Sequence, residues 1–170
     1  MGEGKHYEIE RKYLIAMPDA EMLKHCEGCG VWEIEQVYLT AQPGQTRRVR
    51  RVTEYGETRW YKTFKTRLSD MTAQEDEGQI SGEEYAQFLA QANPALKPIL
   101  KTRYRVPHEG QMLEFDLYPF WTDRAVLEIE LESESEPPMI PDWVHVIREV
   151  TSDFRYKNES LAANVPMDEI

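Results

Sequence analysis

The sequence predicts an α+β fold in which an eight-stranded antiparallel β-barrel closes on itself and helices pack on its outside. Eight segments alternate in character with a period of two, which is typical of strands. In nearly all of them one face is apolar and the other carries charged groups. Short segments with helical spacing lie between the strands, and eight strands are enough to close a barrel and remove both exposed edges.

The first expected strand runs from Tyr7 to Ile15. Successive side chains of a strand point to opposite faces, so Glu8, Glu10 and Lys12 share one face, and only Arg11 interrupts the apolar face. The other seven expected strands are residues 35–40, 46–53, 58–66, 71–80, 99–106, 113–117 and 127–131.

The later strands divide by the sign of their charge. The basic faces carry Arg48 with Arg50, Lys65 with Tyr61 and Thr63, and Lys101 with Arg103. The acidic faces carry Glu75 with Glu77, Glu114 with Asp116, and Glu128 with Glu130. The second strand places Gln36 beside Tyr38. In these later strands, anionic and cationic groups therefore lie on separate strands.

Three helices are expected between or after the strands. Ser81 to Glu84 has the spacing of a capping box, and this helix ends at Asn93-Pro94. Pro18-Asp19 opens a short helix through Leu23, and Ser152-Asp153 starts a C-terminal one. Helices with apolar stripes can cover the apolar faces of the sheet, which leaves the charged faces inside.

An open sheet with a solvated charged face is the alternative to a closed barrel. In a closed barrel, uncompensated buried charges cost several kcal/mol each. A barrel lined by both signs therefore implies that metal ions and a polyanion fill it.

Whole-chain composition limits the classes of function. The 170 residues contain no linker-like stretch, so one domain spanning residues 1–170 is expected. A net charge of −11 argues against a nucleic-acid binder, and no apolar run is long enough to cross a membrane. The start of the chain lacks the apolar core of a secretory signal, which favours the cytoplasm. Cys26 and Cys29 are interpreted as two reduced thiols, because structural zinc needs four ligands.

The charged faces suggest a chemistry. Arginine and lysine bind phosphate groups, arginine through paired contacts, and a collar of them fits a polyphosphate. The cations of this collar are Lys12, Arg48, Arg50, Lys65, Lys101 and Arg103. Carboxylates are the hard oxygen ligands that Mg²⁺ and Mn²⁺ prefer.

At this point the residues resemble a known family, the CYTH domains, also called triphosphate tunnel metalloenzymes. Glu8-Ile9-Glu10-Arg11-Lys12 matches the E-x-E-x-K signature of that family. The resemblance continues, in order, through residues 36–39, 48–50, 63–65, 75–77, 101–104, 114–116, 128–130 and 149–162. It therefore covers almost the entire chain.

The resemblance implies a metal-dependent triphosphatase that most resembles the bacterial inorganic triphosphatases, with Mg²⁺ or Mn²⁺ as cofactor. It implies triphosphate binding by the six collar cations, and catalytic roles for Lys12, Tyr38 and Lys101. The carboxylates expected to serve the metal are Glu8, Glu10, Glu75, Glu77, Asp116, Glu128 and Glu130. Relatives often read R-x-E-x-E where this chain has Ala73-Gln74-Glu75-Asp76-Glu77, so Ala73 removes one cation from the collar.

Several alternatives stay open. Thiamine triphosphatases, nucleoside triphosphatases and class IV adenylate cyclases share the fold, and a polyphosphate-binding module without catalysis is a further reading favoured by Ala73. The four histidines are expected at the surface, and Arg105 and Glu132 at the solvated strand ends. A homodimer is compatible with the sequence, which does not determine the oligomeric state.

Overall fold

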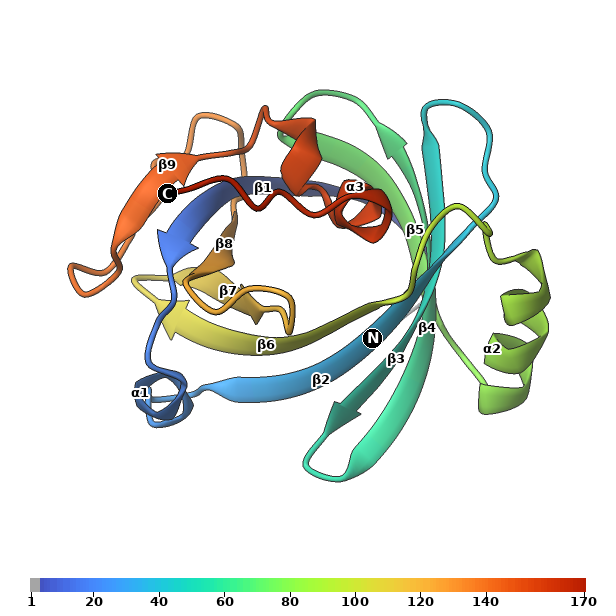
Figure 1. Ribbon diagram of the computed structural model, residues 1–170, viewed down its shortest axis with the longest axis horizontal. Coiled ribbons are helices and arrows are strands. Elements are labelled where there is room, and N and C mark those ends of the chain that lie inside the picture. Colours follow the sequence, from blue (N-terminus) through green and yellow to red (C-terminus); the bar gives the residue numbers. More distant parts are fainter. Residues whose placement is uncertain (1–3) are drawn as a thin grey trace.

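Nine antiparallel strands form one sheet whose order is β5-β4-β3-β2-β6-β7-β8-β1-β9. In this computed structural model β5 also pairs with β1, which closes eight of the strands into a barrel (Figure 1). The structure describes residues 4–170, so residues 1–3 of the expected domain, at the start of the chain, lie outside the described residues. The closed antiparallel barrel is confirmed, and the open-sheet alternative is excluded.

The eight expected strands are all present, most of them longer than expected. The barrel strands are β1 Gly4–Ala16, β2 Gly30–Leu39, β3 Gln45–Glu54, β4 Glu57–Arg67, β5 Thr72–Ile80, β6 Ile99–His108, β7 Gln111–Leu117 and β8 Arg124–Glu130. The ninth strand, β9 (Val146–Glu149), was not predicted. It has four residues, too few for an alternation to be recognised, and it pairs with the end of β1.

Strand β1 closes the barrel because it is long enough to serve two neighbours. Its first half pairs with β5, from Gly4 opposite Glu77 to Ile9 opposite Thr72. Its second half pairs with β8, beginning with Glu10 opposite Glu130.

Two helices cover the outside of the barrel, as expected. Helix α1 (Ala20–Lys24) is capped by Asp19 and buries Leu23 against the outward apolar faces of β1, β6, β7 and β8. Helix α2 (Gly82–Phe88) begins with the expected capping box at Ser81 and packs Tyr85 on outward residues of β2, β3 and β5. It continues as the 3₁₀ turn η1 (Leu89–Gln91). Much of the hydrophobic core thus lies between the barrel wall and its covering.

The C-terminal segment is placed differently from the expectation. The 3₁₀ turn η2 (Phe154–Tyr156) and helix α3 (Asn158–Ala163) pack on Leu14 and Val126, which lie on the inward faces of β1 and β8. Leu14 follows Lys12 and Val126 precedes Glu128 on these faces, so each strand places a buried apolar side chain there that needs an apolar partner. The segment therefore lies across one end of the barrel (Figure 1).

Two further findings concern features expected from the sequence. Cys26 and Cys29 are free thiols in the turn that follows α1. Within residues 4–170, no helix combines the length and the apolar character needed to cross a bilayer.

Candidate functional site

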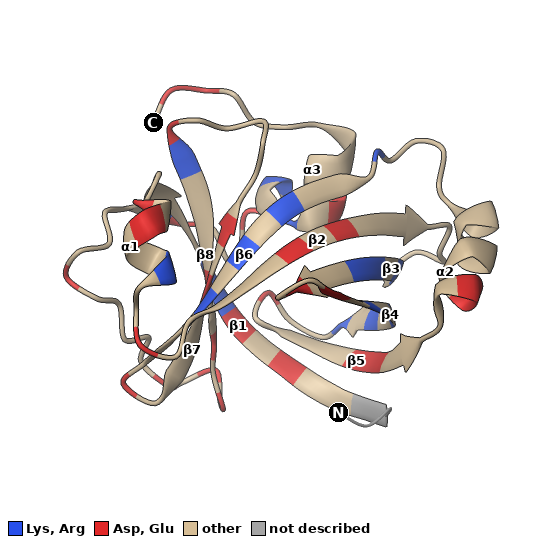
Figure 2. Ribbon diagram, turned by 90° about the horizontal axis from the view of Figure 1, so that it is seen from below, with Lys and Arg blue, Asp and Glu red and all other residues tan. Residues whose placement is uncertain are grey.

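Charged side chains line the inside of the barrel. Apart from Arg124, which pairs with Asp123 at the start of β8, the charged residues at most 9% exposed are Lys12, Arg50, Glu75, Lys101, Arg103, Glu114, Asp116 and Glu128. They come from six of the eight barrel strands and occupy the alternate positions that the sequence pattern assigns to one face. Figure 2 shows Lys and Arg positions and Asp and Glu positions along the barrel strands. The charged faces therefore point inward, as expected.

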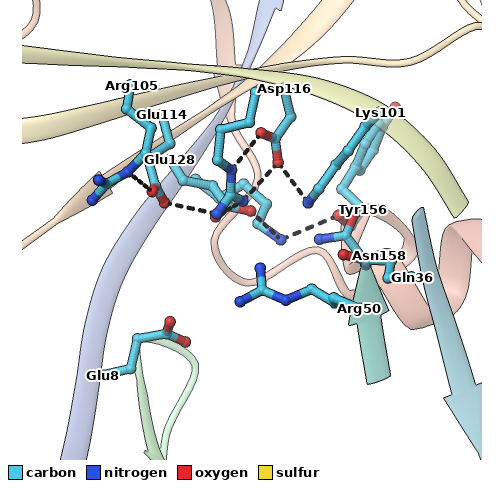
Figure 3. A network of polar contacts seen from close by, with 12 residues as sticks. Glu8, Gln36, Arg50, Lys101, Arg105, Glu114, Asp116, Glu128, Tyr156 and Asn158 are labelled. Carbon is cyan, nitrogen blue, oxygen red and sulfur yellow. Dashed lines mark hydrogen bonds and ion pairs between the residues drawn. The ribbon is translucent and has the colours of Figure 1, made fainter. Parts of the chain in front are cut away.

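One side of the interior is a dense network that we call the paired wall, formed by Lys101, Arg103, Glu114, Asp116 and Glu128. The Asp116 carboxylate accepts hydrogen bonds from Lys101 Nζ at 2.8 Å and from Arg103 Nε and Nη2 at 2.8 and 2.9 Å (Figure 3). Arg103 also pairs with Glu114 at 3.2 Å and with Glu128 at 3.3 Å. Every charge in this wall thus has a partner of opposite sign.

Burial and pairing shift the pKa values of the paired wall. Burial lowers the pKa of Lys101 to about 8, although Asp116 opposes this change. Burial would raise the pKa of Glu128, but Lys12 and Arg103 outweigh it and hold that pKa well below its usual value. Glu128 is therefore an anion, and Lys101 is a cation near neutral pH that loses its proton more readily than an ordinary lysine.

The opposite side of the interior, which we call the β3–β5 wall, is less completely paired. Arg50 Nη2 lies 3.1 Å from Glu77, and Lys65 Nζ lies 2.8 Å from Glu8 and 3.2 Å from Glu75. The buried Nε of Arg48 has no hydrogen-bond partner among the described residues. Burial would lower the pKa of Arg48, but Tyr38 and the carboxylates around it raise that pKa. Arg48 is therefore a permanent cation with unused donor capacity.

A cavity of about 100 Å³ lies between these walls, lined by inward groups of β1, β3 and β4 and by Lys157, Asn158 and Glu159 near α3. Arg103 and Glu128 of the paired wall and Arg48 and Lys65 of the β3–β5 wall all line it. A larger hollow of about 480 Å³ lies beside β2 and β6 and is lined partly by outward residues such as Glu33 and Leu100. The inner cavity is the better candidate site, because the buried charges converge there.

Four carboxylates are the best candidates for metal ligands: Glu8, Glu10 and Glu128, which line the cavity, and Glu130, which lies opposite Glu10 on β8. Burial and the neighbouring Glu128 and Glu8 raise the pKa of Glu10 well above its usual value. Burial, together with Glu114, raises the pKa of Glu130 to about 7. Within residues 4–170, no three acidic, histidine or cysteine side chains are already arranged around a metal position. Mutually repelling carboxylate oxygens nevertheless fit a hard divalent cation, which would relieve the repulsion.

Among these four, Glu8 pairs with Lys65 and Glu128 with Lys12 and Arg103, and the other three expected ligands have cationic partners as well. Asp116 receives three hydrogen bonds from Lys101 and Arg103. Glu77 accepts from Arg50 and from the Thr63 hydroxyl at 2.8 Å, and Glu75 pairs with Lys65. The contacts of these three favour the holding of cations, whereas Glu10 and Glu130, whose pKa values are raised, make no ion pair among the described residues.

Comparison with known proteins decides the family. The CYTH domain model matches residues 6–165. The chain belongs to the CYTH domain family. It is 33% identical over 165 residues to an inorganic triphosphatase of Nitrosomonas europaea, covering 94% of this chain and 99% of that protein. It is 30% identical over 162 residues to an inorganic triphosphatase of Acetivibrio thermocellus, covering 92% and 94%.

Solved structures agree with this CYTH assignment. The crystal structure of the inorganic triphosphatase NE1496 aligns with a TM-score of 0.56 and 28% identity, over 94% of this chain and 96% of that one. A conserved hypothetical protein from Pyrococcus furiosus aligns with a TM-score of 0.59 and 23% identity, over 75% and 80%, which supports the fold alone.

Within this CYTH barrel, the three residues expected to be catalytic all lie inside. Lys12 Nζ is 3.4 Å from Glu128 and donates to the Tyr156 carbonyl at 3.3 Å. Tyr38 is 3% exposed, lines the cavity and accepts a hydrogen bond from Gln36 Nε2 at 2.9 Å. Lys101 belongs to the paired wall. The structure brings these three groups into one interior, and their catalytic roles stay predictions.

Two residues at the barrel rim make contacts that were not predicted. His6 is exposed, as expected of a surface residue, but its Nε2 lies 3.0 Å from Glu75, because His6 alternates with Glu8 on the inward face of β1. Arg105 was expected to be solvated, but its Nε donates to Glu114 at 2.9 Å and its guanidinium stacks on Trp32. Both belong to the rim of the charged interior.

Two further cations of the cavity were missed. Arg67 lies two residues after Lys65 on β4 and lines the cavity, so extending the alternation by one step would have found it. Lys157 reaches the cavity from the segment between η2 and α3. No sequence signal identified Lys157, because its place depends on how the C-terminal segment crosses the barrel end.

Proposed function

We propose that this protein hydrolyses inorganic triphosphate to diphosphate and phosphate inside its barrel, with Mg²⁺ or Mn²⁺ as cofactor. The observation that carries this proposal is the convergence of buried cations and carboxylates from opposite walls on one cavity. The two relatives described as inorganic triphosphatases support the substrate class. A polyanion and a divalent cation together supply the charges that such an interior lacks.

The six collar cations would bind the triphosphate. Arg48 and Arg50 each have a buried Nε with no hydrogen-bond partner among the described residues, and an ion pair with a carboxylate is made by Lys12, Arg50, Lys65, Lys101 and Arg103. Phosphate oxygens would therefore replace some carboxylate partners, and the released carboxylates would become available to a metal. This exchange keeps the interior close to electroneutral and avoids leaving any charge buried alone.

Glu8, Glu10, Glu128 and Glu130 would hold the metal. A bound divalent metal supplies neutralisation of phosphate charge and activation of water in such reactions. Glu75, Glu77 and Asp116 would instead hold Lys65, Arg50, Lys101 and Arg103 in position. This division assigns all seven predicted acidic residues a place in the site.

The chain's own cations would then act on the reacting phosphate. Phosphoryl transfer requires positioning and the stabilisation of developing negative charge more than a covalent nucleophile. Arg103 is held by Asp116, and Lys12 and Lys101 each touch a carboxylate, so their positive ends are oriented before substrate arrives. The Tyr38 hydroxyl, which accepts from Gln36, would donate its own proton to a phosphate oxygen or to the attacking water.

The test is phosphate release from tripolyphosphate, ATP and thiamine triphosphate, each with Mg²⁺, with Mn²⁺ and with excess EDTA. We expect metal-dependent release, with tripolyphosphate the preferred substrate. Full activity in EDTA would overturn the metal assignment. Binding of tripolyphosphate without any release would instead identify a polyphosphate-binding module, and preference for ATP or thiamine triphosphate would change the substrate.

A further inference from the structure

Arg67, the last residue of β4, points into the site. It follows Lys65 by two positions, so both side chains lie on the inward face of the strand. Arg67 lines the inner cavity together with Lys12 and Lys157. It also lines a recess of about 20 Å³ at the same end, where Glu10 and Asp70 are the acidic neighbours.

Ala73 lies directly across from Arg67. The register of β4 and β5 places Arg67 opposite Ala73, and the register of β1 and β5 places Ala73 opposite Glu8. Ala73 is fully buried, on the same inward face as Glu75 and Glu77. Directly opposite residues have Cβ atoms about 4.5–5.5 Å apart. An arginine side chain is longer than this separation, so a guanidinium from either position reaches the same part of the cavity.

The charge around Arg67 is incompletely balanced. Within residues 4–170, the ion pairs made by cations of β4 are those of Arg59 and Lys65, so Arg67 has no carboxylate partner. Lys157 also faces this region, and burial, followed by repulsion from Arg67 and Lys12, lowers its pKa to about 8. Arg67 and Lys157 make no ion pair among the described residues, and together with Lys12, which pairs with Glu128, they form a local site for a multiply charged anion.

We propose that Arg67 binds the triphosphate from β4 and takes the place of the cation that Ala73 does not provide on β5. This inference rests on the proposed function and concerns the same cavity. It explains how the chain can keep the same number of cations around the triphosphate although Ala73 replaces the arginine of the R-x-E-x-E pattern.

The test is a double-mutant cycle of Arg67→Ala, Ala73→Arg and the combined variant, measured as KM and kcat for tripolyphosphate and as melting temperature. Arg67 is largely solvated, so we expect Arg67→Ala to raise KM about fivefold and to change kcat less. The combined variant should return KM to within about twofold of wild type, because the guanidinium enters from the opposite strand. Ala73→Arg alone should lower the melting temperature without improving KM, because two cations then face each other.

Two matched controls separate binding from structure. Arg59→Ala removes another exposed arginine of β4, one that pairs with Glu57 and is outside the cavity lining, and it should leave KM unchanged. Asp70→Asn removes the acidic neighbour of Arg67 and should leave KM unchanged or lower it. If Asp70→Asn instead raised KM as Arg67→Ala does, Arg67 would be a support for the β4–β5 turn and the inference would be wrong.

The remaining outcomes distinguish this inference from the proposed function. If the wild type hydrolyses tripolyphosphate and Arg67→Ala is as active as the Arg59→Ala control, the role of Arg67 is overturned and the proposed function is not. A raised KM that Ala73→Arg does not rescue would overturn the exchange between the two strands. A wild-type protein that neither binds nor hydrolyses tripolyphosphate would overturn the proposed function and the inference together.

Discussion

The paired wall and the β3–β5 wall contain the same kinds of side chain but differ in how completely their charges are matched. In the paired wall Asp116 is fully buried, and Lys101 and Arg103 both donate to it. In the β3–β5 wall, the buried Arg48 Nε has no hydrogen-bond partner among the described residues. Matched buried charges hold a geometry, whereas an unmatched buried cation is a site for an incoming anion.

The difference indicates a division of labour within one barrel. The carboxylates of the paired wall hold Lys101 and Arg103 in fixed positions, and a substrate must displace some of these carboxylates to bind. The β3–β5 wall, with Arg48, retains capacity for the phosphate oxygens themselves. Substitutions in the paired wall should therefore lower mainly the stability of the fold, and substitutions in the β3–β5 wall should lower mainly the affinity for triphosphate.

The largest expected effect is on stability, from Asp116→Asn in the paired wall. This substitution keeps the volume but leaves Lys101 and Arg103 buried without their shared anion. Breaking a buried ion pair in this way costs about 3–5 kcal/mol of unfolding free energy, measurable by urea denaturation. Glu57→Gln, which removes an exposed partner of Arg59, serves as the control and should change little. A loss below about 1 kcal/mol for Asp116→Asn would show that the paired wall does not stabilise the barrel.

Arg48→Ala should show the opposite profile. Its affinity for tripolyphosphate should fall about ten- to hundredfold, the equivalent of one charge-assisted contact, while the unfolding free energy changes little. Calorimetric titration and urea denaturation measure the two quantities on the same sample. Arg103→Ala is the matched comparison and should lower both, because Arg103 touches Asp116, Glu114 and Glu128. If Arg48→Ala unfolded as readily as Asp116→Asn, the distinction between the walls would fail.

Glu130→Gln tests the acidic end of the cavity through its pH dependence. The folded-state pKa of Glu130 is raised to about 7, above the ordinary 4.5. Its contribution to stability is therefore fully present below about pH 4.5 and is lost as pH rises through 7. We expect the metal-free wild type to lose stability over this pH range. Part of that loss should be absent in Glu130→Gln. The turnover of this variant should recover partly at high metal concentration. Identical melting curves against pH for both proteins would contradict this account.

The smallest expected effect is that of Lys157→Arg at high pH. The pKa of Lys157 is lowered to about 8, so the wild type progressively loses this positive charge above pH 8. Its affinity for tripolyphosphate should fall between pH 7.5 and 9.5, and Lys157→Arg, which stays charged, should lose less. Lys101, also near 8, titrates in both proteins, so the difference should be a few-fold. Parallel affinity profiles would remove Lys157 from the anion site.

The parts of this fold that a sequence can predict are those that depend on alternation. A period of two identified all eight barrel strands and placed Glu8, Arg50 and Asp116 on the inward face. Alternation gives the face of a side chain but not its partner across the barrel. The hydrogen bonds that Lys101 and Arg103 donate to Asp116 were therefore not predicted, and Asp116 was expected to bind a metal.

Other features depend on packing between distant segments. Helix α3 was expected outside, yet its segment crosses a barrel end because Leu14 and Val126 make the inward face apolar there. Lys157 reaches the cavity only as a consequence of that crossing. Arg67 was within reach of the alternation argument and was lost because the expected strand ended one residue too early.

The most direct test of the central claim is a crystal structure with tripolyphosphate and Mn²⁺ bound. We predict phosphate oxygens within hydrogen-bond distance of Arg48 and Arg103, one from each wall, and anomalous manganese scattering beside Glu10 and Glu130. Lys101 and Arg103 should keep their contacts with Asp116, because that carboxylate positions them. An anion in the hollow beside Glu33 and Leu100, or manganese bound outside the barrel, would contradict the account.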